Sequence, residues 1–415
     1  MVRSPRRVMI SIATCLRKVD SRRNPLSRSA TAPPGRGSVS VDEQEPLMPT
    51  PARVVFLPEA DEPLAVERVD LPDPSDFQVV VRQFASGICH SQLHQMHNPR
   101  NGDQILGHEA TGEVIKVGSQ VTNVQVGDIV FVTWVPRNPD TATREVDPVV
   151  VERPNGRTAT TRNVFTWADT TIADEKYIVK VPQDTRRDVT SIIGCAVLTG
   201  SGAVYNTAAV REGDSVVIFG VGGVGLSAVV AASVVNADPI IAVDLDDEKL
   251  EFAKRFGATH GVNASGGDAI EQVHALTQGE GLTSFGEPIS GADFAFDCIG
   301  REVTMGQILR AVRPGILGAE TGGTAVLVGV PQSGVTFSEV DMRGMLINEK
   351  KYIGSIGGSC HPDRDFPMFL AWAEDGALDL DAMVTERFTI GQINEATTAL
   401  EHGEIFGRAI MEFDD

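Results

Sequence analysis

A glycine-rich turn between a strand and a helix constrains the fold of this 415-residue chain most. Residues 215–225 read SVVIFGVGGVG, so β-forming residues precede the turn and an apolar segment follows it. Gly220, Gly222 and Gly225 form the pattern Gly-x-Gly-x-x-Gly. The first glycine allows a tight turn, the second admits a phosphate close to the backbone, and the third lets the helix pack on the strand. The run predicts a βαβ unit that binds a dinucleotide, with the phosphates at the helix N-terminus.

An acidic residue in the expected place supports this reading. Asp244 follows Gly225 by 19 residues and ends the next apolar strand, 240–244. Its carboxylate is expected to accept hydrogen bonds from the adenosine ribose and to repel a 2′-phosphate. Residues 245–248 read LDDE and supply no arginine for such a phosphate. NAD is therefore the predicted cofactor rather than NADP.

The spacing of apolar residues changes along the chain and predicts two kinds of domain. Short β-segments separated by turns predict a barrel-like β domain: 53–57, 78–85, 113–117, 128–134 and 176–181. Apolar strands that alternate with helical spacing predict a doubly wound parallel sheet: strands 216–220, 240–244, 293–298 and 324–329, with helices 224–235, 248–256 and 269–277. A last strand is expected at 408–413. The expected fold class is α/β, with residues 48–196 and 355–415 as the catalytic domain and 197–354 as the NAD-binding domain.

Charge and cysteine content narrow the class of protein. The net charge of −20 excludes a nucleic acid or an anionic membrane as partner, and no apolar run approaches the length of a membrane span. Five cysteines without a Cys-x-x-Cys pair do not predict a disulfide framework. We expect a cytoplasmic protein, because thiol ligands need a reducing compartment.

Residues 1–47 differ from the remainder of the chain. They carry nine Lys and Arg against four acidic residues, together with many Ser, Pro and Gly. This composition predicts a disordered extension. It fits either a targeting segment or an upstream extension ahead of a natural start at Met48.

Three separated residues are candidate ligands of one catalytic zinc. Cys89, His108 and Cys195 lie in the runs GICHS, GHE and GCAVLTG. Two thiolates and one imidazole hold zinc tetrahedrally and leave a fourth position for substrate, the arrangement already known in alcohol dehydrogenase. Taken singly, a buried Cys or His is more often a packing residue. Together with the glycine turn, the three residues predict zinc-assisted hydride transfer to a nicotinamide.

From about residue 50 to residue 415 the chain resembles the zinc-dependent medium-chain alcohol dehydrogenases, with a GroES-like catalytic domain and a Rossmann domain. The matching runs are GICHS at 87–91, GHE at 107–109, VGD at 126–128, GC at 194–195, FGVGGVG at 219–225, FDCIG at 296–300 and VGVP at 328–331.

The resemblance implies a role for each matching residue. Cys89, His108 and Cys195 would hold zinc, with Glu109 behind it. Ser91 would accept the substrate's proton, and His94 would finish the relay that runs through the cofactor ribose to solvent. The remaining implied cofactor contacts are His90 and Arg408 at the phosphates, Lys249 at the adenosine ribose, Thr199 at the nicotinamide, and Gly223, Val224 and Val330 along the cofactor.

Three departures from the family pattern stand out. Between residues 128 and 165 there is no cysteine, so the second, structural zinc of many relatives is not expected, and a shortened polar loop replaces its lobe. Gln92 stands where relatives carry Asp, which we expect to make the zinc more electrophilic. Trp134 and Trp167 stand where relatives line the substrate channel with smaller aromatic residues.

The expected activity is NAD-dependent interconversion of primary alcohols and aldehydes, with medium-sized or aromatic substrates favoured and a homo-oligomer as the assembly. An enzymatic alternative is a dehydrogenase of thiol-conjugated formaldehyde, for which the arginines between residues 137 and 162 would bind carboxylates. A third hypothesis, from another class, is a non-catalytic dinucleotide-binding protein. A zinc-free quinone or enoyl reductase is disfavoured because it needs no zinc ligands.

Overall fold

A computed structural model describes residues 49–59, 62–336 and 340–414 of the chain. Residues Met48–Asp415 form one compact unit. The disorder expected for residues 1–47 concerns a segment outside the described residues. No helix in the described part has the length and apolar character needed to cross a membrane.

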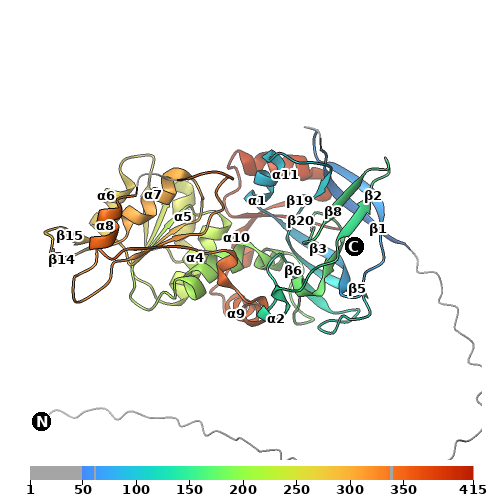
Figure 1. The fold of residues 1–415 in the computed structure, drawn as a ribbon, viewed down its shortest axis with the longest axis horizontal. Coiled ribbons are helices and arrows are strands. Elements are labelled where there is room, and N and C mark those ends of the chain that lie inside the picture. The colour runs from blue at the N-terminus through green and yellow to red at the C-terminus, as the bar shows by residue number, and fades with distance from the viewer. Residues whose placement is uncertain (1–48, 60–61, 337–339, 415) are drawn as a thin grey trace, which may run out of the picture. The chain divides into compact units, whose positions relative to one another are not determined.

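Six parallel strands form one sheet in the order β13-β12-β11-β16-β17-β18 (Figure 1). The strand that precedes the glycine turn, β11, lies inside this sheet, and the chain continues outward from it in both directions. This reversal of strand order is the doubly wound arrangement that the apolar strands predicted. The strands are β11 (Val216–Phe219), β12 (Ile240–Asp244), β13 (His260–Asn263), β16 (Phe294–Asp297), β17 (Thr324–Leu327) and β18 (Lys351–Gly354).

Helices cover both faces of the parallel sheet. Successive residues of β11 point to opposite faces: Ile218 packs in the hydrophobic cluster that holds Leu226 of α4, and Val217 packs in the cluster that holds Ile270 of α6. Three of the five helices begin at an aspartate whose side chain accepts a backbone N–H, at α5, α6 and α8. The helices are α4 (Gly223–Val234), α5 (Asp247–Lys254), α6 (Ala269–Leu276), α7 (Glu302–Ala311) and α8 (Met342–Ile347).

The rest of the described chain is built mainly on antiparallel strands, with one parallel pair, β19 and β20. One sheet has the order β10-β6-β5-β3-β20-β19, with β9 also paired to β3, and a second has the order β2-β1-β4. The strands are β1 (Thr50–Leu57), β2 (Ala65–Leu71), β3 (Gln78–Ile88), β4 (Gln104–Ile105), β5 (Glu109–Val117), β6 (Ile129–Thr133), β9 (Thr170–Asp174), β10 (Ile178–Lys180), β19 (Val384–Thr389) and β20 (Arg408–Glu412). The helices are α1 (His90–His97), α3 (Ala196–Gly202), α9 (Pro362–Glu374), α10 (Leu380–Met383) and α11 (Ile393–Glu401). The expected fold class, a GroES-like domain with a Rossmann domain, is confirmed.

The last strand of the chain completes the first part of the fold. β20 lies between β3 and β19, and its Ala409 pairs antiparallel with Ile88. The strands from before residue 196 and after residue 355 therefore share the mainly antiparallel sheets, and the strands of the six-stranded parallel sheet come from between them. We propose on this basis the domain division given above, 48–196 with 355–415, and 197–354.

Two segments carry structure that the sequence pattern did not predict. The expected polar loop contains a short helix, α2 (Pro139–Ala142), and a hairpin of β7 (Val149–Glu152) and β8 (Thr158–Thr161). A second hairpin, β14 (Gln278–Leu282) with β15 (Pro288–Ser290), follows α6. We call residues 134–165 the lobe.

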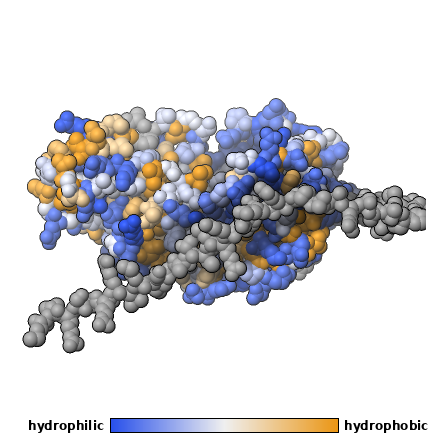
Figure 2. Space-filling view, turned by 60° about the horizontal axis from the view of Figure 1, so that its bottom comes forward, coloured by the Kyte–Doolittle hydropathy of each residue, from blue (hydrophilic) through white to orange (hydrophobic). Residues whose placement is uncertain are grey.

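Exposed apolar side chains gather near the second hairpin. Leu282, Phe285, Met342 and Leu346 are more than half exposed. Figure 2 shows hydrophobic residues concentrated at the end of the unit that carries α8 and the β14–β15 hairpin in Figure 1. Exposed apolar patches of this kind are typical of protein–protein contacts.

Candidate metal and dinucleotide site

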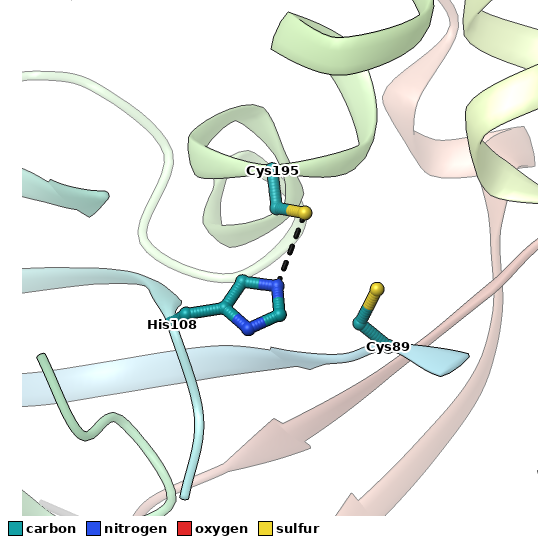
Figure 3. A group of neighbouring side chains, drawn as sticks. All are labelled: Cys89, His108 and Cys195. Carbon is teal, nitrogen blue, oxygen red and sulfur yellow. Dashed lines mark hydrogen bonds between the residues drawn. The ribbon is translucent and has the colours of Figure 1, made fainter. Parts of the chain in front are cut away.

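Cys89, His108 and Cys195 converge from three parts of the chain (Figure 3). Their ligand atoms lie within 4.8 Å of one another, and His108 Nε2 lies 3.1 Å from Cys195 Sγ. Zinc bonds of about 2.0–2.3 Å in a tetrahedron separate ligand atoms by roughly 3.5–4 Å. Two sulfurs and an imidazole nitrogen at these separations fit one zinc ion.

Local backbone structure brings the three ligands to this point. Cys89 and Cys195 each directly precede a helix, α1 and α3, where free N–H groups favour a thiolate. His108 follows Gly107, whose φ is +95°. A Cβ on Gly107 would lie 2.4 Å from the backbone nitrogen of Trp167, so only glycine allows this turn into β5.

The two cysteines differ in acidity. The pKa of Cys89 lies well below that of a free thiol, because the Cys195 thiol hydrogen-bonds to it and Arg408 adds positive charge, although burial opposes this. The pKa of Cys195 is raised well above the usual value by its hydrogen bond to Cys89 and by burial. The pair therefore holds one negative charge readily, and a cation is needed to stabilise the second.

Gln92 connects two of the ligands. Its side chain is buried, its Oε1 accepts a hydrogen bond from the Cys89 backbone N–H at 3.1 Å, and its Nε2 contacts His108 Nδ1. This contact leaves His108 Nε2 facing Cys195. The side chain predicted to orient a zinc ligand from behind thus touches both Cys89 and His108.

A buried ion pair lies behind the ligands. Arg408 Nη2 contacts Glu109 Oε1, and Glu109 Oε2 accepts a hydrogen bond from the Ala196 backbone N–H at 3.3 Å. A Cβ on Gly223 would lie 2.9 Å from Arg408 Cδ. Burial opposes the charge of Arg408, but the acidic groups around it raise its pKa. Arg408 therefore lies between the metal ligands and the start of α4, where the phosphates are expected.

A cavity of about 360 Å³ opens beside the three ligands. The predicted residues that line it are His90, Ser91, His94, Trp134, Thr199, Val224 and Val330. Ser91 Oγ, Thr199 Oγ1 and Trp134 Nε1 are buried atoms without a hydrogen-bond partner. Burial lowers the pKa of His90, which keeps this imidazole neutral. Unpartnered polar groups at a cavity are expected where a ligand supplies the missing bonds.

Trp167 corrects one expectation. Its side chain is completely buried in a hydrophobic cluster with Leu93 and Leu106, and its Nε1 donates to the Gly87 carbonyl oxygen at 3.3 Å. It is not among the residues that line the cavity, whereas Trp134 is. A satisfied indole in the core packs the protein and cannot shape the channel.

The glycine turn has the geometry that its pattern requires. Gly220 has a φ of +84°, and a Cβ on Gly225 would lie 1.8 Å from the Gly220 carbonyl oxygen. Gly222 is followed by α4, which starts at Gly223. Asp244 Oδ2 accepts a hydrogen bond from the Val221 backbone N–H at 3.0 Å, so the acid also fixes the turn.

Lys249 contacts the segment that precedes β20. Its Nζ donates to the Gly403 carbonyl oxygen at 3.1 Å and lies 5.9 Å from the centre of the Phe406 ring. The contact joins α5 of the parallel-sheet part to the segment that precedes β20.

Several lining residues were not predicted. They include Thr161, Asn163, Val164, Cys298, Ile299 and Ile356. Cys298 and Ile299 follow β16 directly, and ligands of doubly wound sheets bind at the carboxyl ends of strands, so these two had a sequence signal. The others depend on long-range packing of the lobe and of the segment after β18.

Comparisons with known proteins agree with this geometry. Residues 75–183 match the alcohol dehydrogenase GroES-like domain, and residues 223–375 match the zinc-binding dehydrogenase domain. The chain is 31% identical over 388 residues to alcohol dehydrogenase class-3 of Cereibacter sphaeroides, covering 87% of this chain and 99% of that protein. The chain belongs to the zinc-dependent medium-chain alcohol dehydrogenases.

Other members of the alcohol dehydrogenase family are similarly close. S-(hydroxymethyl)glutathione dehydrogenase of Paracoccus denitrificans is 31% identical over 379 residues, which is 85% of this chain and 97% of that one. The crystal structure of benzyl alcohol dehydrogenase from Acinetobacter calcoaceticus matches with a TM-score of 0.75 and 26% identity, covering 88% of this chain and all of that chain. A zinc-binding domain protein from Burkholderia ambifaria matches with a TM-score of 0.77, 26% identity and the same coverage.

Proposed function

We propose that this alcohol dehydrogenase interconverts uncharged primary alcohols and aldehydes, with NAD as cofactor and one zinc ion on Cys89, His108 and Cys195. The observation that carries the proposal is the convergence of these ligand atoms at a cavity that Thr199 and the first turn of α4 also line. When bound, zinc polarises the substrate oxygen and NAD accepts the hydride.

The chain's own residues would move the proton and hold the cofactor. Ser91 Oγ, buried at the cavity and without a partner, accepts the proton of the substrate hydroxyl. His94, which also lines the cavity, passes it toward solvent. The Arg408 guanidinium contributes positive charge near the phosphates. Asp244 at the end of β12 favours a free ribose hydroxyl, and hence NAD.

The walls of the cavity favour an uncharged substrate with a flat or apolar body. None of the described lining residues is Lys or Arg. Trp134 offers an aromatic surface close to the zinc ligands, since its ring lies 6.4 Å from that of His108, centre to centre. The similarity to a benzyl alcohol dehydrogenase supports an aromatic or medium-chain alcohol.

Oxidation of S-(hydroxymethyl)glutathione is the second candidate, because one relative with 31% identity and others with 29% are named S-(hydroxymethyl)glutathione dehydrogenase. Its carboxylates would need cationic partners, but four of the five lobe arginines already pair with carboxylates, and the exposed Arg162 bonds to a backbone carbonyl. The partners are Asp363 for Arg137, Asp174 and Glu175 for Arg144, Glu67 and Asp103 for Arg153, Asp103 and Glu59 for Arg157, and the Val146 carbonyl oxygen for Arg162. This pairing favours the uncharged alcohol.

We also propose a homo-oligomer in a reducing compartment such as the cytoplasm. The edge strand β18 has a parallel partner on one side, β17, and Met342 and Leu346 on the preceding helix are exposed. An edge strand beside exposed apolar residues is a typical self-association surface. Cys89 and Cys195 must stay reduced to bind metal.

A substrate and cofactor panel tests the function. The purified chain is expected to contain one zinc and to reduce NAD with benzyl alcohol. With NADP, kcat/KM should be at least roughly 100-fold lower, since like charges in contact cost several kcal/mol. Formaldehyde is assayed with and without glutathione. Turnover only in the presence of glutathione would favour the second candidate, and NAD binding without any turnover would contradict both.

A further inference from the structure

One buried arginine joins three segments of the antiparallel part. The Arg153 side chain is only 6% exposed. Its Nε donates to Glu67 Oε2 at 2.9 Å, and its Nη2 contacts the other oxygen of the same carboxylate. Its Nη1 contacts Asp103, whose side chain is completely buried. The guanidinium also lies 4.9 Å from the centre of the Phe56 ring. The Arg153 guanidinium therefore contacts two carboxylates and lies next to one aromatic ring.

From Asp103, the chain continues within a few residues to the metal ligand His108. Asp103 immediately precedes β4, and four residues later the chain reaches Gly107 and then His108. Ile105 and Leu106, between these points, line the cavity. A shift of Asp103 is transmitted through this short, buried segment to one wall of the cavity and to a metal ligand.

From Arg153, the chain continues through β8 to a second wall of the cavity. Arg153 directly follows β7, and the chain turns and returns as β8, where Ala159 forms a bridge with Asp103. β8 ends at Thr161, and Thr161, Asn163 and Val164 line the cavity. The segments that form the two walls therefore both start at the contact between Arg153 and Asp103.

Charge burial makes this pair more than a surface contact. Burial alone would raise the pKa of Asp103, but the hydrogen bonds from Arg153 and from the Glu59 backbone N–H outweigh it and lower that pKa. Arg157 reaches the same carboxylate at 2.6 Å from outside, with a side chain that is 43% exposed. Removing Arg153 leaves a buried charge with a solvent-screened partner, whereas removing Arg157 leaves the buried pair intact.

We propose that Arg153 is a positioning residue that clamps together two walls of the substrate cavity, residues 105–108 and residues 161–164, and so sets which alcohols are accepted. The inference rests on the proposed alcohol dehydrogenase activity for its substrate readout. A short alcohol at the zinc does not need the lobe wall, but an aromatic alcohol extends along it. Loosening the clamp therefore weakens the binding of the larger substrate selectively.

The test compares benzyl alcohol with 1-propanol in the full-length, zinc-loaded protein. In Arg153→Met, the ratio of kcat/KM for benzyl alcohol over that for 1-propanol is expected to fall about tenfold, mainly through the KM for benzyl alcohol. Arg153→Lys keeps the positive charge but cannot make the bidentate contact of a guanidinium, so it should restore only part of the ratio. Glu67→Gln weakens the same clamp without leaving a buried charge unpaired, and it replaces Arg153→Met if that variant does not fold.

Arg157→Met is the matched control, since it removes an exposed partner of the same aspartate. It should leave the ratio unchanged. Hydrogen–deuterium exchange supplies a readout independent of activity: residues 103–108 and 159–164 should exchange faster together in Arg153→Met and not in Arg157→Met. Equal losses for both alcohols, or faster exchange confined to the turn after Arg153, would overturn the proposal. If the wild type oxidises neither alcohol, the proposed function fails, and the exchange result alone decides whether the clamp exists.

Discussion

At the scale of single residues, the hydrogen bonds of Gln92 set the state of a metal ligand. Its one carbonyl oxygen accepts from the Cys89 backbone N–H, so its amide nitrogen is the atom that contacts His108 Nδ1. An imidazole that binds metal through Nε2 carries its proton on Nδ1. The amide N–H of Gln92 and the protonated Nδ1 of His108 are then two hydrogen-bond donors that face each other. An aspartate offers two acceptor oxygens and would satisfy both Cys89 and His108.

Replacing Gln92 by aspartate should therefore tighten zinc binding. We expect Gln92→Asp to lower the zinc dissociation constant about tenfold, the lower end of what outer partners of metal ligands contribute. The measurement is competition with a chelator of known affinity. Gln95→Asp is the control, because it adds the same charge to the same helix at an exposed residue of the cavity wall, whereas Gln92 contacts Cys89 and His108 directly. Weaker zinc binding in Gln92→Asp alone would contradict this account.

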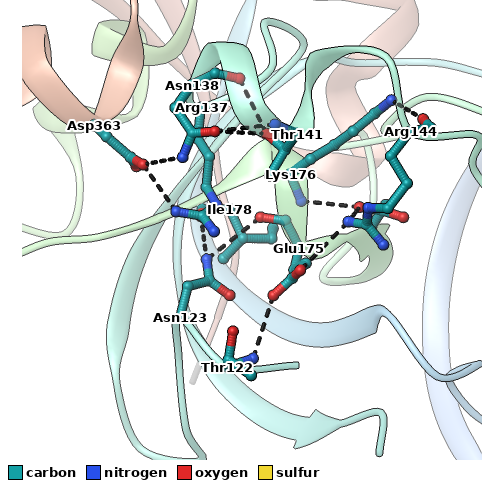
Figure 4. A network of polar contacts seen from close by, with 11 residues as sticks. Thr122, Asn123, Arg137, Asn138, Thr141, Arg144, Glu175, Lys176, Ile178 and Asp363 are labelled. Atoms are coloured by element: carbon teal, nitrogen blue, oxygen red, sulfur yellow. Dashed lines mark hydrogen bonds and ion pairs between the residues drawn. The ribbon is translucent and has the colours of Figure 1, made fainter. Parts of the chain in front are cut away.

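At the scale of elements, the lobe is held by arginine where many relatives use a second zinc. Figure 4 shows Arg144 directed at Glu175, with Lys176 Nζ donating to the Arg144 carbonyl oxygen at 2.7 Å. Arg144 also pairs with Asp174, and its guanidinium lies 4.1 Å from the centre of the Phe77 ring. Both carboxylates are buried, so the pair is little screened by solvent.

Loss of this arginine should destabilise the protein measurably. Breaking a buried ion pair costs about 3–5 kcal/mol, and the 24% exposure of Arg144 reduces this to about 2 kcal/mol for Arg144→Met. The expected result is a lower free energy of unfolding in urea, with the zinc content unchanged. Arg162→Met is the comparison within the lobe, since its exposed side chain bonds only to a backbone carbonyl. Similar losses for the two variants would show that Arg144 has no special role.

The elements differ in how far the sequence predicted them. Buried strands such as β11 and β12 are continuous apolar runs, and their observed bounds agree with the predicted ones within one residue. β14 reads QGEGL and is exposed at every position, so no hydrophobic pattern marks it. The β7–β8 hairpin did have a signal, because Asn155-Gly156 separates its strands and Gly156 has a φ of +80°. The expectation of a polar loop rests on the runs PRNPDTAT at 136–143 and RPNGR at 153–157, and it overlooks the three valines of β7.

In the candidate site, too, some residues have a local sequence signal and others do not. Cys89, His108 and Cys195 lie in short runs whose chemistry is local, and the structure brings them together. Whether Trp134 or Trp167 faces the cavity depends on how the lobe packs against β3 and β4. Gly87, whose carbonyl oxygen binds the Trp167 indole, is 80 residues away in the sequence. No local pattern encodes a contact of that kind.

At the scale of the whole molecule, the fold does not depend on a metal. The hydrophobic clusters are built from aliphatic and aromatic residues on both parts of the chain, and neither Cys89 nor Cys195 belongs to them. Zinc thus adds binding energy to a structure that already has its core. This contrasts with small domains that unfold when zinc is removed.

Removal of zinc should accordingly abolish activity and leave the fold in place. With zinc at about 100 times its dissociation constant, binding contributes about 2.7 kcal/mol to stability. For a chain of this size, we expect the Tm of the chelated protein to fall by less than about 10 °C. Circular dichroism during heating, with and without chelator, provides the measurement. Unfolding of the metal-free protein at 25 °C would show that zinc is structural.

The position of β20 also has a consequence for synthesis. The strand that precedes Cys89 cannot gain its neighbour β20 until Ala409 has been synthesised, because Ala409 pairs with Ile88. A nascent chain that stops short of Arg408 already contains all three zinc ligands, but Glu109 would lack its counter-ion. Full assembly of the active centre therefore requires a chain that extends at least through Arg408 and its strand.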